Sequence, residues 1–299
     1  MTSYYLGIDG GGSTLRMVLT DSALNVLATL HEPQSANPTS IGDDAARVRL
    51  QTAIQQVLQG YDVHQVRACG AGISGTSQRL DWVHSILAEV LPYTRIFATS
   101  DVEIALVGAQ AQRQGVLALA GTGSVVYGVN AQGQACMVGG WGYLLGDEGS
   151  GFWLGRQALS YLTQCADSGQ WTISAQSLLD SLDVADPRQM TRWLYHDFST
   201  QKVARLAPQV LAWAQAGEAW AQALVQQGAL ALAHQVQQVV QRLALQPVQV
   251  ALAGGLLEHP TPLRQAFQHA MHQAGYAVLE SPAYTPVLGA ALFAKLNSI

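Results

Sequence analysis

The stretch Asp9-Gly10-Gly11-Gly12-Ser13-Thr14 decides how this chain is organised. It follows a short apolar run, residues 4–8, which we expect to form a buried strand, and it precedes further strands at residues 15–20 and 26–30. The glycine-rich loops of dinucleotide-binding proteins and of P-loop proteins lead directly into a helix. Because a strand follows here, the glycines form the turn of a hairpin, and both of those nucleotide sites are excluded.

The same pattern returns 111 residues later in the chain. Leu119-Ala120-Gly121-Thr122-Gly123-Ser124 aligns without a gap on Ile8-Asp9-Gly10-Gly11-Gly12-Ser13, and strands are again predicted after it, at residues 125–129 and 135–138. Glycines let the backbone approach a ligand closely, and successive N–H groups in such turns bind anions. Two hairpins that face one another would bind a polyphosphate from both sides.

Composition excludes several other functions. Of 15 basic residues among 299, only Lys202 and Lys295 are lysines, so neither a Walker A loop nor a kinase site built on a strand lysine is possible. A net charge of -5 argues against nucleic acid as a partner. No apolar run approaches the ~18 residues of a membrane span, and the first residues lack the basic region of a signal peptide. We therefore expect a soluble, cytoplasmic protein that has no membrane partner.

Cysteines and histidines give no metal site. Cys69, Cys136 and Cys165 are odd in number and far apart, which argues against a disulfide framework and fits a reducing compartment. Of eight dispersed histidines, only His269 and His272 share a predicted helix face, without the partners that a structural zinc site needs.

Helices and strands alternate through the rest of the chain. Helices are predicted at residues 41–58, 78–91, 102–112, 149–166, 218–243, 262–274 and 285–296, and others begin near residues 186 and 199; strands are predicted at 66–73, 95–98 and 248–253. Because the second hairpin begins directly after Gln114-Gly115, we place a domain boundary there. The expected domains are residues 1–114 and 115–284 of an α/β protein.

Asp101 is a candidate catalytic carboxylate. It follows Thr99-Ser100 where a predicted strand ends and a helix begins. An aspartate there is often no more than a helix N-cap. The carboxyl ends of strands are, however, where open α/β sheets bind ligands, and a carboxylate near an acceptor hydroxyl can take its proton during phosphoryl transfer.

The segment of residues 139–150, GGWGYLLGDEGS, is the richest in candidate ligand groups. Its five glycines surround two aromatic residues and the adjacent carboxylates Asp147 and Glu148, a composition costly in chain entropy for an ordinary loop. Such a loop can present carboxylates and backbone groups to a polyhydroxylated ligand. Three weaker candidates are Ser35-Ala36-Asn37, Ile73-Ser74-Gly75 and Ala253-Gly254-Gly255, each of which also fits an ordinary turn.

These motifs together resemble the superfamily of sugar kinases, actin and heat-shock chaperones. Within it, the chain is similar to the N-acetylglucosamine kinase branch of the BadF/BadG-type ATPase group, from residue 7 to residue 294. The resemblance is carried by residues 7–14, by residues 121–124 and above all by GGWG followed by GDEGS in residues 139–150. YHDF at residues 195–198 and Ala253-Gly254-Gly255 also match.

The resemblance implies two ribonuclease-H-like, actin-like lobes with ATP and Mg²⁺ in a central cleft between them. The last helix, within residues 285–299, would complete the first lobe, and a homodimer is expected. Asp9 would hold hydrated Mg²⁺, and Asp101 would be the general base on the sugar 6-hydroxyl. The phosphates would contact Gly10, Gly11, Gly12, Ser13, Thr14, Gly121, Thr122, Gly123 and Ser124. The adenine would contact Gly254, Gly255 and Ala204. The sugar would contact Asn37, Ser74, Gly75, Asp101, Gly140, Trp141, Gly142 and Asp147.

The leading hypothesis is an ATP-dependent kinase that makes N-acetylglucosamine 6-phosphate. Glucosamine stays open as the acceptor, because the sequence does not place the side chains around the 2-substituent. A second hypothesis is an ATP-hydrolysing activator of a partner enzyme, but relatives of that kind hold an iron–sulfur cluster through paired cysteines, which this chain lacks. A third, a sugar-binding module without turnover, gives no role to Asp101. Residues 167–186 match no motif.

Overall fold

A computed structural model describes residues 3–76 and 78–298. Within those residues no helix is long and apolar enough to cross a membrane. The chain divides into two compact units. Residues 1–117, 129–134 and 280–299 form unit 1, and residues 118–128 and 135–279 form unit 2.

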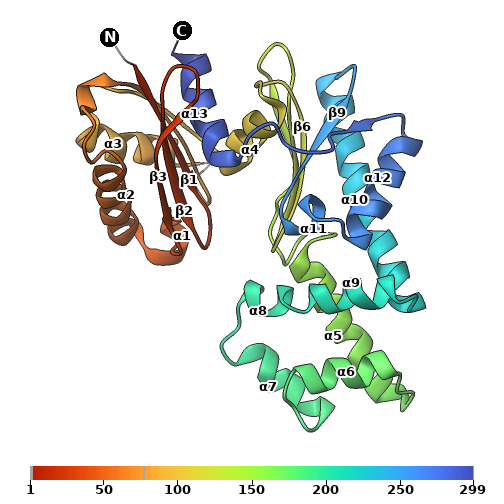
Figure 1. The fold of residues 1–299 in the computed structure, drawn as a ribbon. Helices are drawn as coiled ribbons and strands as arrows, with labels where there is room; N and C mark the ends of the chain where they lie inside the picture. The colour runs from red at the N-terminus through yellow and green to blue at the C-terminus, as the bar shows by residue number, and fades with distance from the viewer. Residues whose placement is uncertain (1–2, 77, 299) are drawn as a thin grey trace. The chain divides into compact units, whose positions relative to one another are not determined.

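Unit 1 is built on a five-stranded sheet with the order β3-β2-β1-β4-β5 (Figure 1). Its strands are β1 (Tyr4–Gly10), β2 (Leu15–Thr20), β3 (Val26–Glu32), β4 (Val66–Ile73) and β5 (Arg95–Thr99). The first three strands pair antiparallel, as consecutive hairpins do, whereas β1, β4 and β5 run parallel. The carboxyl ends of these three parallel strands therefore meet at one edge of the sheet.

Helices cover the sheet of unit 1. They are α1 (Pro38–Ile41), α2 (Asp43–Val57), α3 (Leu80–Val90), α4 (Asp101–Gln110) and the last helix, α13 (Pro286–Asn297), with a 3-10 turn, η1, at Val63–Gln65. Apolar residues of α2 and α3, such as Leu50, Ile54 and Ile86, form one core with Leu6 and Ile8 of β1.

The final helix, α13, packs so closely against the sheet and α4 that backbone atoms touch. A Cβ atom on Gly7 of β1 would lie 2.2 Å from the carbonyl oxygen of Val287, and one on Gly289 would lie 2.1 Å from that of Ile104. Glycine is thus required on both sides of this contact, and residues from the two ends of the chain build unit 1.

Unit 2 contains most of a second five-stranded sheet, with the order β10-β9-β6-β7-β8; residues 115–117 of β6 and residue 129 of β7 fall in unit 1. Its strands are β6 (Gly115–Ala120), β7 (Ser124–Val129), β8 (Ala135–Gly139), β9 (Gln249–Ala253) and β10 (Ala277–Val278). The helices α10 (Ala219–Leu243), α11 (Gly255–Glu258) and α12 (Pro262–Gln273) accompany the sheet. The predicted α/β class with two actin-like units is confirmed.

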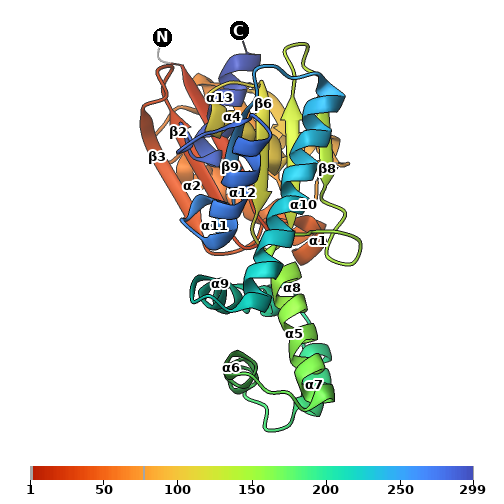
Figure 2. The ribbon, with the colours of Figure 1, turned by 90° about the vertical axis from the view of Figure 1, so that its right-hand side faces the viewer.

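A helical segment extends from one end of the second sheet (Figure 2). It comprises α5 (Gly151–Ser168), α6 (Ile173–Ser181), a 3-10 turn, η2 (Pro187–Gln189), α7 (Met190–Tyr195), α8 (Thr200–Ala204) and α9 (Ala207–Gln215). Ser150 begins α5 as its N-cap, with its side chain accepting from the Trp153 N–H. The helices predicted near residues 186 and 199 begin at the N-caps Asp186 and Ser199.

Several details differ from the sequence predictions, and the short elements α11 and β10 were not predicted. β1 continues through Gly10, because Asp9 and Gly10 still pair with β2 and β4. The single helix predicted at residues 41–58 is broken at Gly42, whose φ of 83° lies outside the helical region. Residues 167–186 contain α6, capped by Thr172, which we missed because its short apolar face was hidden among polar residues.

Candidate active site

The carboxyl edge of the first sheet brings three candidates together. Asp9 lies at the end of β1, Ser74 directly follows β4, and Asp101 directly follows Ser100 after β5. The Ser74 N–H donates to the Gly10 carbonyl oxygen at 2.7 Å, and the Ser74 side chain hydrogen-bonds to Asp101. The N-cap of α4 is Ser100, which accepts from the Glu103 N–H. Asp101 is therefore not needed as the cap, the simpler role considered for it.

Asp9 is a buried carboxylate with a cation beside it. It is 8% exposed, and Arg16, its partner across the β1–β2 ladder, lies 3.5 Å from its Oδ2. Burial raises the pKa of the Asp9 carboxyl to about 6; Arg16 opposes the shift and the charge of Asp101 adds to it. The effect of Asp101 on Asp9 indicates that the two carboxylates lie near each other.

Asp101 is also shielded from water, and burial raises its pKa against the lowering effect of hydrogen bonds from the Val102 N–H and the Ser74 side chain. A raised pKa brings a carboxylate closer to the neutral pH at which a general base works best. The Val102 N–H donates to Asp101 Oδ1 at 3.0 Å. Asp101 thus has the environment expected of a base.

The first glycine turn is open. The Gly11 N–H donates to the Thr14 carbonyl oxygen at 2.8 Å, and Gly12 and Ser13 are exposed. A Cβ atom on Gly12 would meet no heavy atom of the described residues within 4 Å. The backbone at Gly12 and Ser13 is therefore open to a ligand.

Asn37 and Gly75, from two segments that looked unremarkable in sequence, lie side by side. A Cβ atom on Gly75 would lie 2.5 Å from Asn37 Oδ1. Asn37 is buried, and its Oδ1 accepts from the Thr39 N–H at 2.8 Å. The Ser35 hydroxyl donates to the Gly11 carbonyl oxygen at 3.3 Å. Residues 35–37 and residues 73–75 thus lie near the first turn. They belong to unit 1, as does Asp101.

The second glycine turn is held by the segment that follows residue 145. The Gly121 carbonyl oxygen accepts from the Gly151 N–H at 2.7 Å, and that of Thr122 accepts from the Phe152 N–H at 3.0 Å. The buried Ser124 hydroxyl donates to the Glu148 carbonyl oxygen at 2.9 Å. The start of α5 therefore fixes the shape of this turn.

Asp147 and Gly140 contact the same turn. A Cβ atom on Gly123 would lie 2.9 Å from Asp147 Oδ2. Burial raises the pKa of Asp147, and the charge of Glu148 adds to that effect, whereas a hydrogen bond from the Ser124 N–H lowers it. The Gly140 N–H donates to the Ser124 carbonyl oxygen at 3.1 Å. Two residues predicted for the sugar thus lie against the predicted phosphate turn of unit 2, while Trp141 between them is 75% exposed.

The residues predicted for the adenine also gather around the second turn. Gly254, with a φ of 81°, packs so closely on β6 that a Cβ atom would lie 2.3 Å from the Ala120 carbonyl oxygen. Ala204 lies beside Gly151, where a Cβ atom would be 3.2 Å from that of Ala204. Gly255 begins α11 and faces open space. All three belong to unit 2.

Sequence reasoning missed three residues of this region. Arg16 could have been found, because a two-strand hairpin places it opposite Asp9. Ser150 lies within the quoted segment 139–150, but its role as the fully buried N-cap of α5 was missed. Gln235 of α10 contacts Gly139, and no signal in the sequence distinguishes it from the other glutamines of that helix.

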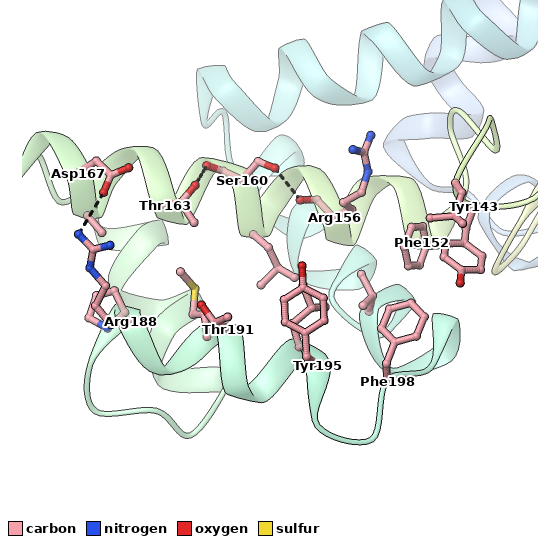
Figure 3. A pocket seen from close by; sticks show the side chains of 17 residues that line it. Tyr143, Phe152, Arg156, Ser160, Thr163, Asp167, Arg188, Thr191, Tyr195 and Phe198 are labelled. Carbon is pink, nitrogen blue, oxygen red and sulfur yellow. Dashed lines mark hydrogen bonds and ion pairs between the residues drawn. The ribbon is translucent and has the colours of Figure 1, made fainter.

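A cavity of about 770 Å³ lies in the helical segment of unit 2. Figure 3 shows it between α5 and α7, with Tyr143, Phe152 and Phe198 at one end and the Asp167–Arg188 ion pair at the other. Its lining includes neither glycine turn, and its one carboxylate, Asp167, is exposed and paired with Arg188. This cavity is not the site of the predicted phosphate chemistry.

Comparison with known proteins identifies relatives over nearly the whole chain. The chain is 31% identical over 275 residues to an N-acetylmuramic acid/N-acetylglucosamine kinase of Clostridium acetobutylicum, covering 89% of each protein. It is 30% identical over 317 aligned positions to an N-acetyl-D-glucosamine kinase of Dictyostelium discoideum, covering 98% of each. A glucosamine kinase of Vibrio cholerae matches at 27% identity over 170 residues, covering 55% of this chain and 56% of the relative.

Solved structures agree in fold. A structure from Chromobacterium violaceum superposes with a TM-score of 0.77 at 26% identity, covering 97% of this chain and 98% of the other. A glucokinase of the ROK family from Streptomyces griseus, in complex with glucose and AMPPNP, superposes with a TM-score of 0.61 at 17% identity, covering 98% and 100%. The second likeness shows the fold alone.

The family follows from a sequence profile that spans almost the complete chain. The profile of the BadF/BadG/BcrA/BcrD ATPase family matches residues 6–294. This match and the relatives confirm the resemblance inferred from residues 7–14, 121–124 and 139–150. The chain belongs to the BadF/BadG/BcrA/BcrD ATPase family.

Proposed function

We propose that the protein is an ATP-dependent kinase of N-acetyl-D-glucosamine that forms the 6-phosphate. The observation that carries the proposal is the pair of carboxylates at one sheet edge, the buried Asp9 beside the open glycine turn and the partly buried Asp101, to which Ser74 hydrogen-bonds. Relatives named as N-acetylglucosamine kinases cover 89% and 98% of the chain, which supports the choice of acceptor.

Asp101 is the proposed general base. Its carboxylate would take the proton of the sugar 6-hydroxyl as that oxygen bonds to the γ-phosphorus of ATP, and ADP leaves with the electrons of the broken phosphorus–oxygen bond. Ser74 would hold the carboxylate in place, and Asn37 and Gly75 would contact the sugar from the same unit. Gly140, Trp141, Gly142 and Asp147 would contact it from unit 2.

The phosphates would be bound mainly by backbone. Residues 10–14 and 121–124 supply N–H groups, and Thr14 and Thr122 supply hydroxyls. Both lysines lie outside these turns; Lys202, for example, donates to backbone carbonyl oxygens in α7 and after it. Positioning and charge neutralisation account for most of the catalysis of phosphoryl transfer.

Asp9 fits the hydrated Mg²⁺ that accompanies ATP. The described residues contain no cluster of three or more histidine, cysteine or acidic side chains that could enclose a metal. Mg²⁺ is usually held by one or two carboxylates together with substrate phosphates and water, and the buried Asp9 next to an open turn meets that requirement. When bound, Mg²⁺ would neutralise charge on the phosphates. The same proposal includes the two predicted lobes, residues 1–114 with 285–299 and residues 115–284, with a cleft between them. It also includes a cytoplasmic homodimer.

Glucosamine is the alternative acceptor, favoured by the match to the Vibrio cholerae enzyme. The activator hypothesis has less support. Cys69 lies buried in β4, Cys165 lies buried in α5, and Cys136 lies in β8, so the three free thiols occupy three separate elements. A cluster ligated by paired cysteines of each subunit has no place to form.

The test is a comparison of N-acetylglucosamine, glucosamine, N-acetylmannosamine and glucose as acceptors, with ATP and Mg²⁺ present. We expect ADP formation that depends on N-acetylglucosamine and a sugar 6-phosphate identified by mass spectrometry and NMR. Higher kcat/KM for glucosamine would favour the alternative. ATP hydrolysis that is independent of every sugar, with no sugar phosphate formed, would refute the kinase proposal.

A further inference from the structure

Both ends of loop 139–150 rest on one face of α10. A Cβ atom on Gly139 would lie 2.8 Å from Gln235 Oε1, and one on Gly149 would lie 2.8 Å from the Gly228 carbonyl oxygen and 2.7 Å from Leu232 Cδ1. Residues 228, 232 and 235 are spaced by four and three positions, which places them along a single helix face. Helix α10 therefore contacts loop 139–150 near both of its ends.

The loop between these contacts has unusual backbone and exposed apolar side chains. Left-handed φ values, between 61° and 85°, occur at Gly139, Gly140, Gly142, Asp147 and Gly149. Trp141, Leu144 and Leu145 are 75%, 81% and 79% exposed. Bulky apolar side chains gain stability when they are covered, so contact with a ligand would stabilise these three. Its glycines are the positions at which the backbone can change most freely.

Gln235 stands out beneath the first end of the loop. Its side chain is 8% exposed, and within the described part of the chain no donor reaches its Oε1. Gln238, three residues further along α10, shows the usual arrangement, since its amide nitrogen pairs with His234. A buried amide oxygen without a donor destabilises the folded state, and an apolar side chain of the same length would not. Gln235 is thus unfavourable in this conformation of the loop.

We infer that Gln235 is a positioning residue for loop 139–150, whose backbone donates an N–H to Gln235 Oε1 when the acceptor sugar is bound. The inference rests on the proposed function, because it assigns the sugar as the ligand that stabilises this loop conformation. In that state the bond fixes the start of the loop, and with it Trp141 and Asp147, against the acceptor. The amide oxygen is then paired only in the sugar complex, so its cost in the free protein is recovered as sugar affinity.

The test compares Gln235→Met, Gln235→Glu and a matched control, Gln241→Met, on an exposed position of the same helix. Met keeps the length of the side chain and removes the acceptor, whereas Glu keeps an acceptor at the same place. We would measure Tm without ligand, the rise in Tm caused by N-acetylglucosamine, and kcat and KM for the sugar and for ATP.

For Gln235→Met we expect an unchanged or higher Tm without ligand, a smaller rise in Tm with sugar, and a sugar KM about fivefold to tenfold higher, the effect of one hydrogen bond. The KM for ATP should stay within about twofold. Gln235→Glu should retain most of the sugar affinity, and Gln241→Met should match the wild type.

If the wild type phosphorylates the sugar, either of two results would overturn the inference. One is a lower Tm for Gln235→Met with an unchanged sugar KM, which would show a structural side chain paired through ordered water. The other is an equal rise in sugar KM for Gln235→Glu and Gln235→Met. A wild type that phosphorylates no amino sugar would instead refute the proposed function, and the two failures are thereby distinguished.

Discussion

The two glycine turns, residues 10–14 and 121–124, share a sequence pattern, but the first is exposed and the second is contacted by neighbouring residues. The first is exposed at Gly12 and Ser13, and beside it lie the carboxylates of Asp9 and Asp101. The second has Ala120 at the position of Asp9, and residues 147–152 contact it on several sides. The two hairpins therefore differ in their surroundings: the turn of the first lies beside two carboxylates, whereas the turn of the second is contacted by the segment that follows residue 145.

The largest effect should come from Asp101→Asn. Removal of the proposed base should lower kcat by about 10²–10⁴-fold with little change in ATP binding, measured by steady-state kinetics and by calorimetry with an ATP analogue. Asp81→Asn, at an exposed carboxylate in the first turn of α3, is the control and should remain fully active. Near-normal turnover by Asp101→Asn would show that the base has been assigned to the wrong residue.

Asp9→Asn tests the second carboxylate of the first turn, and its effect on stability depends on pH. The pKa of Asp9 is about 6 in the folded protein against 3.8 as the reference. Between pH 3.8 and pH 6 the folded state thus binds more protons than the unfolded state. The free energy of unfolding of the wild type therefore falls as the pH rises through this window. Above pH 6 the ligand-free variant should be more stable than the wild type by up to about 3 kcal/mol.

That gain should vanish as the pH falls toward 4, which urea unfolding at a series of pH values would show. The same variant should lose activity and should need more Mg²⁺. If its stability gain were constant from pH 4 to pH 8, the raised pKa would not be its cause.

Gly123→Ala and Gly12→Ala compare the turns directly. The new methyl group at residue 123 would lie 2.9 Å from Asp147 Oδ2, whereas the one at residue 12 meets open space. We expect a loss of about 1–3 kcal/mol for Gly123→Ala, as for other overpacked sites, and a change below about 0.5 kcal/mol for Gly12→Ala. Gly12→Ala should raise the KM for ATP, because it blocks close approach of the phosphates. Equal destabilisation of the two variants would contradict the described difference between the turns.

The smallest difference should separate Ser124→Ala from Ser13→Ala, two residues related by the repeat. Ser124 is buried and donates to the Glu148 carbonyl oxygen, so its loss should cost about 1 kcal/mol. Ser13 is exposed, and its loss should change the free energy of unfolding by less than about 0.5 kcal/mol. Thermal denaturation of both variants decides the point. A cost at residue 13 as large as at residue 124 would mean that the first turn is also held by its surroundings.

Local patterns in the sequence were enough to predict most secondary structure. The strands at residues 15–20 and 66–73 have the predicted bounds, and the N-caps Asp186 and Ser199 were identified from their side chains. These features depend on residues adjacent in the chain, such as alternating apolar positions and capping side chains. Helix α6 was missed, since nine residues with a weak apolar pattern give too little local signal.

The two hairpins, their glycine turns and the strand-end position of Asp101 could be predicted without the structure, because each depends on a continuous run of residues. Only the tertiary structure placed Asn37 against Gly75, Asp147 against Gly123 and Gln235 beneath Gly139. Each of these contacts joins residues from separate elements, and their distances depend on how the strands and helices pack. The sequence fixes which groups are present, whereas packing decides which of them are buried, paired or left without a partner.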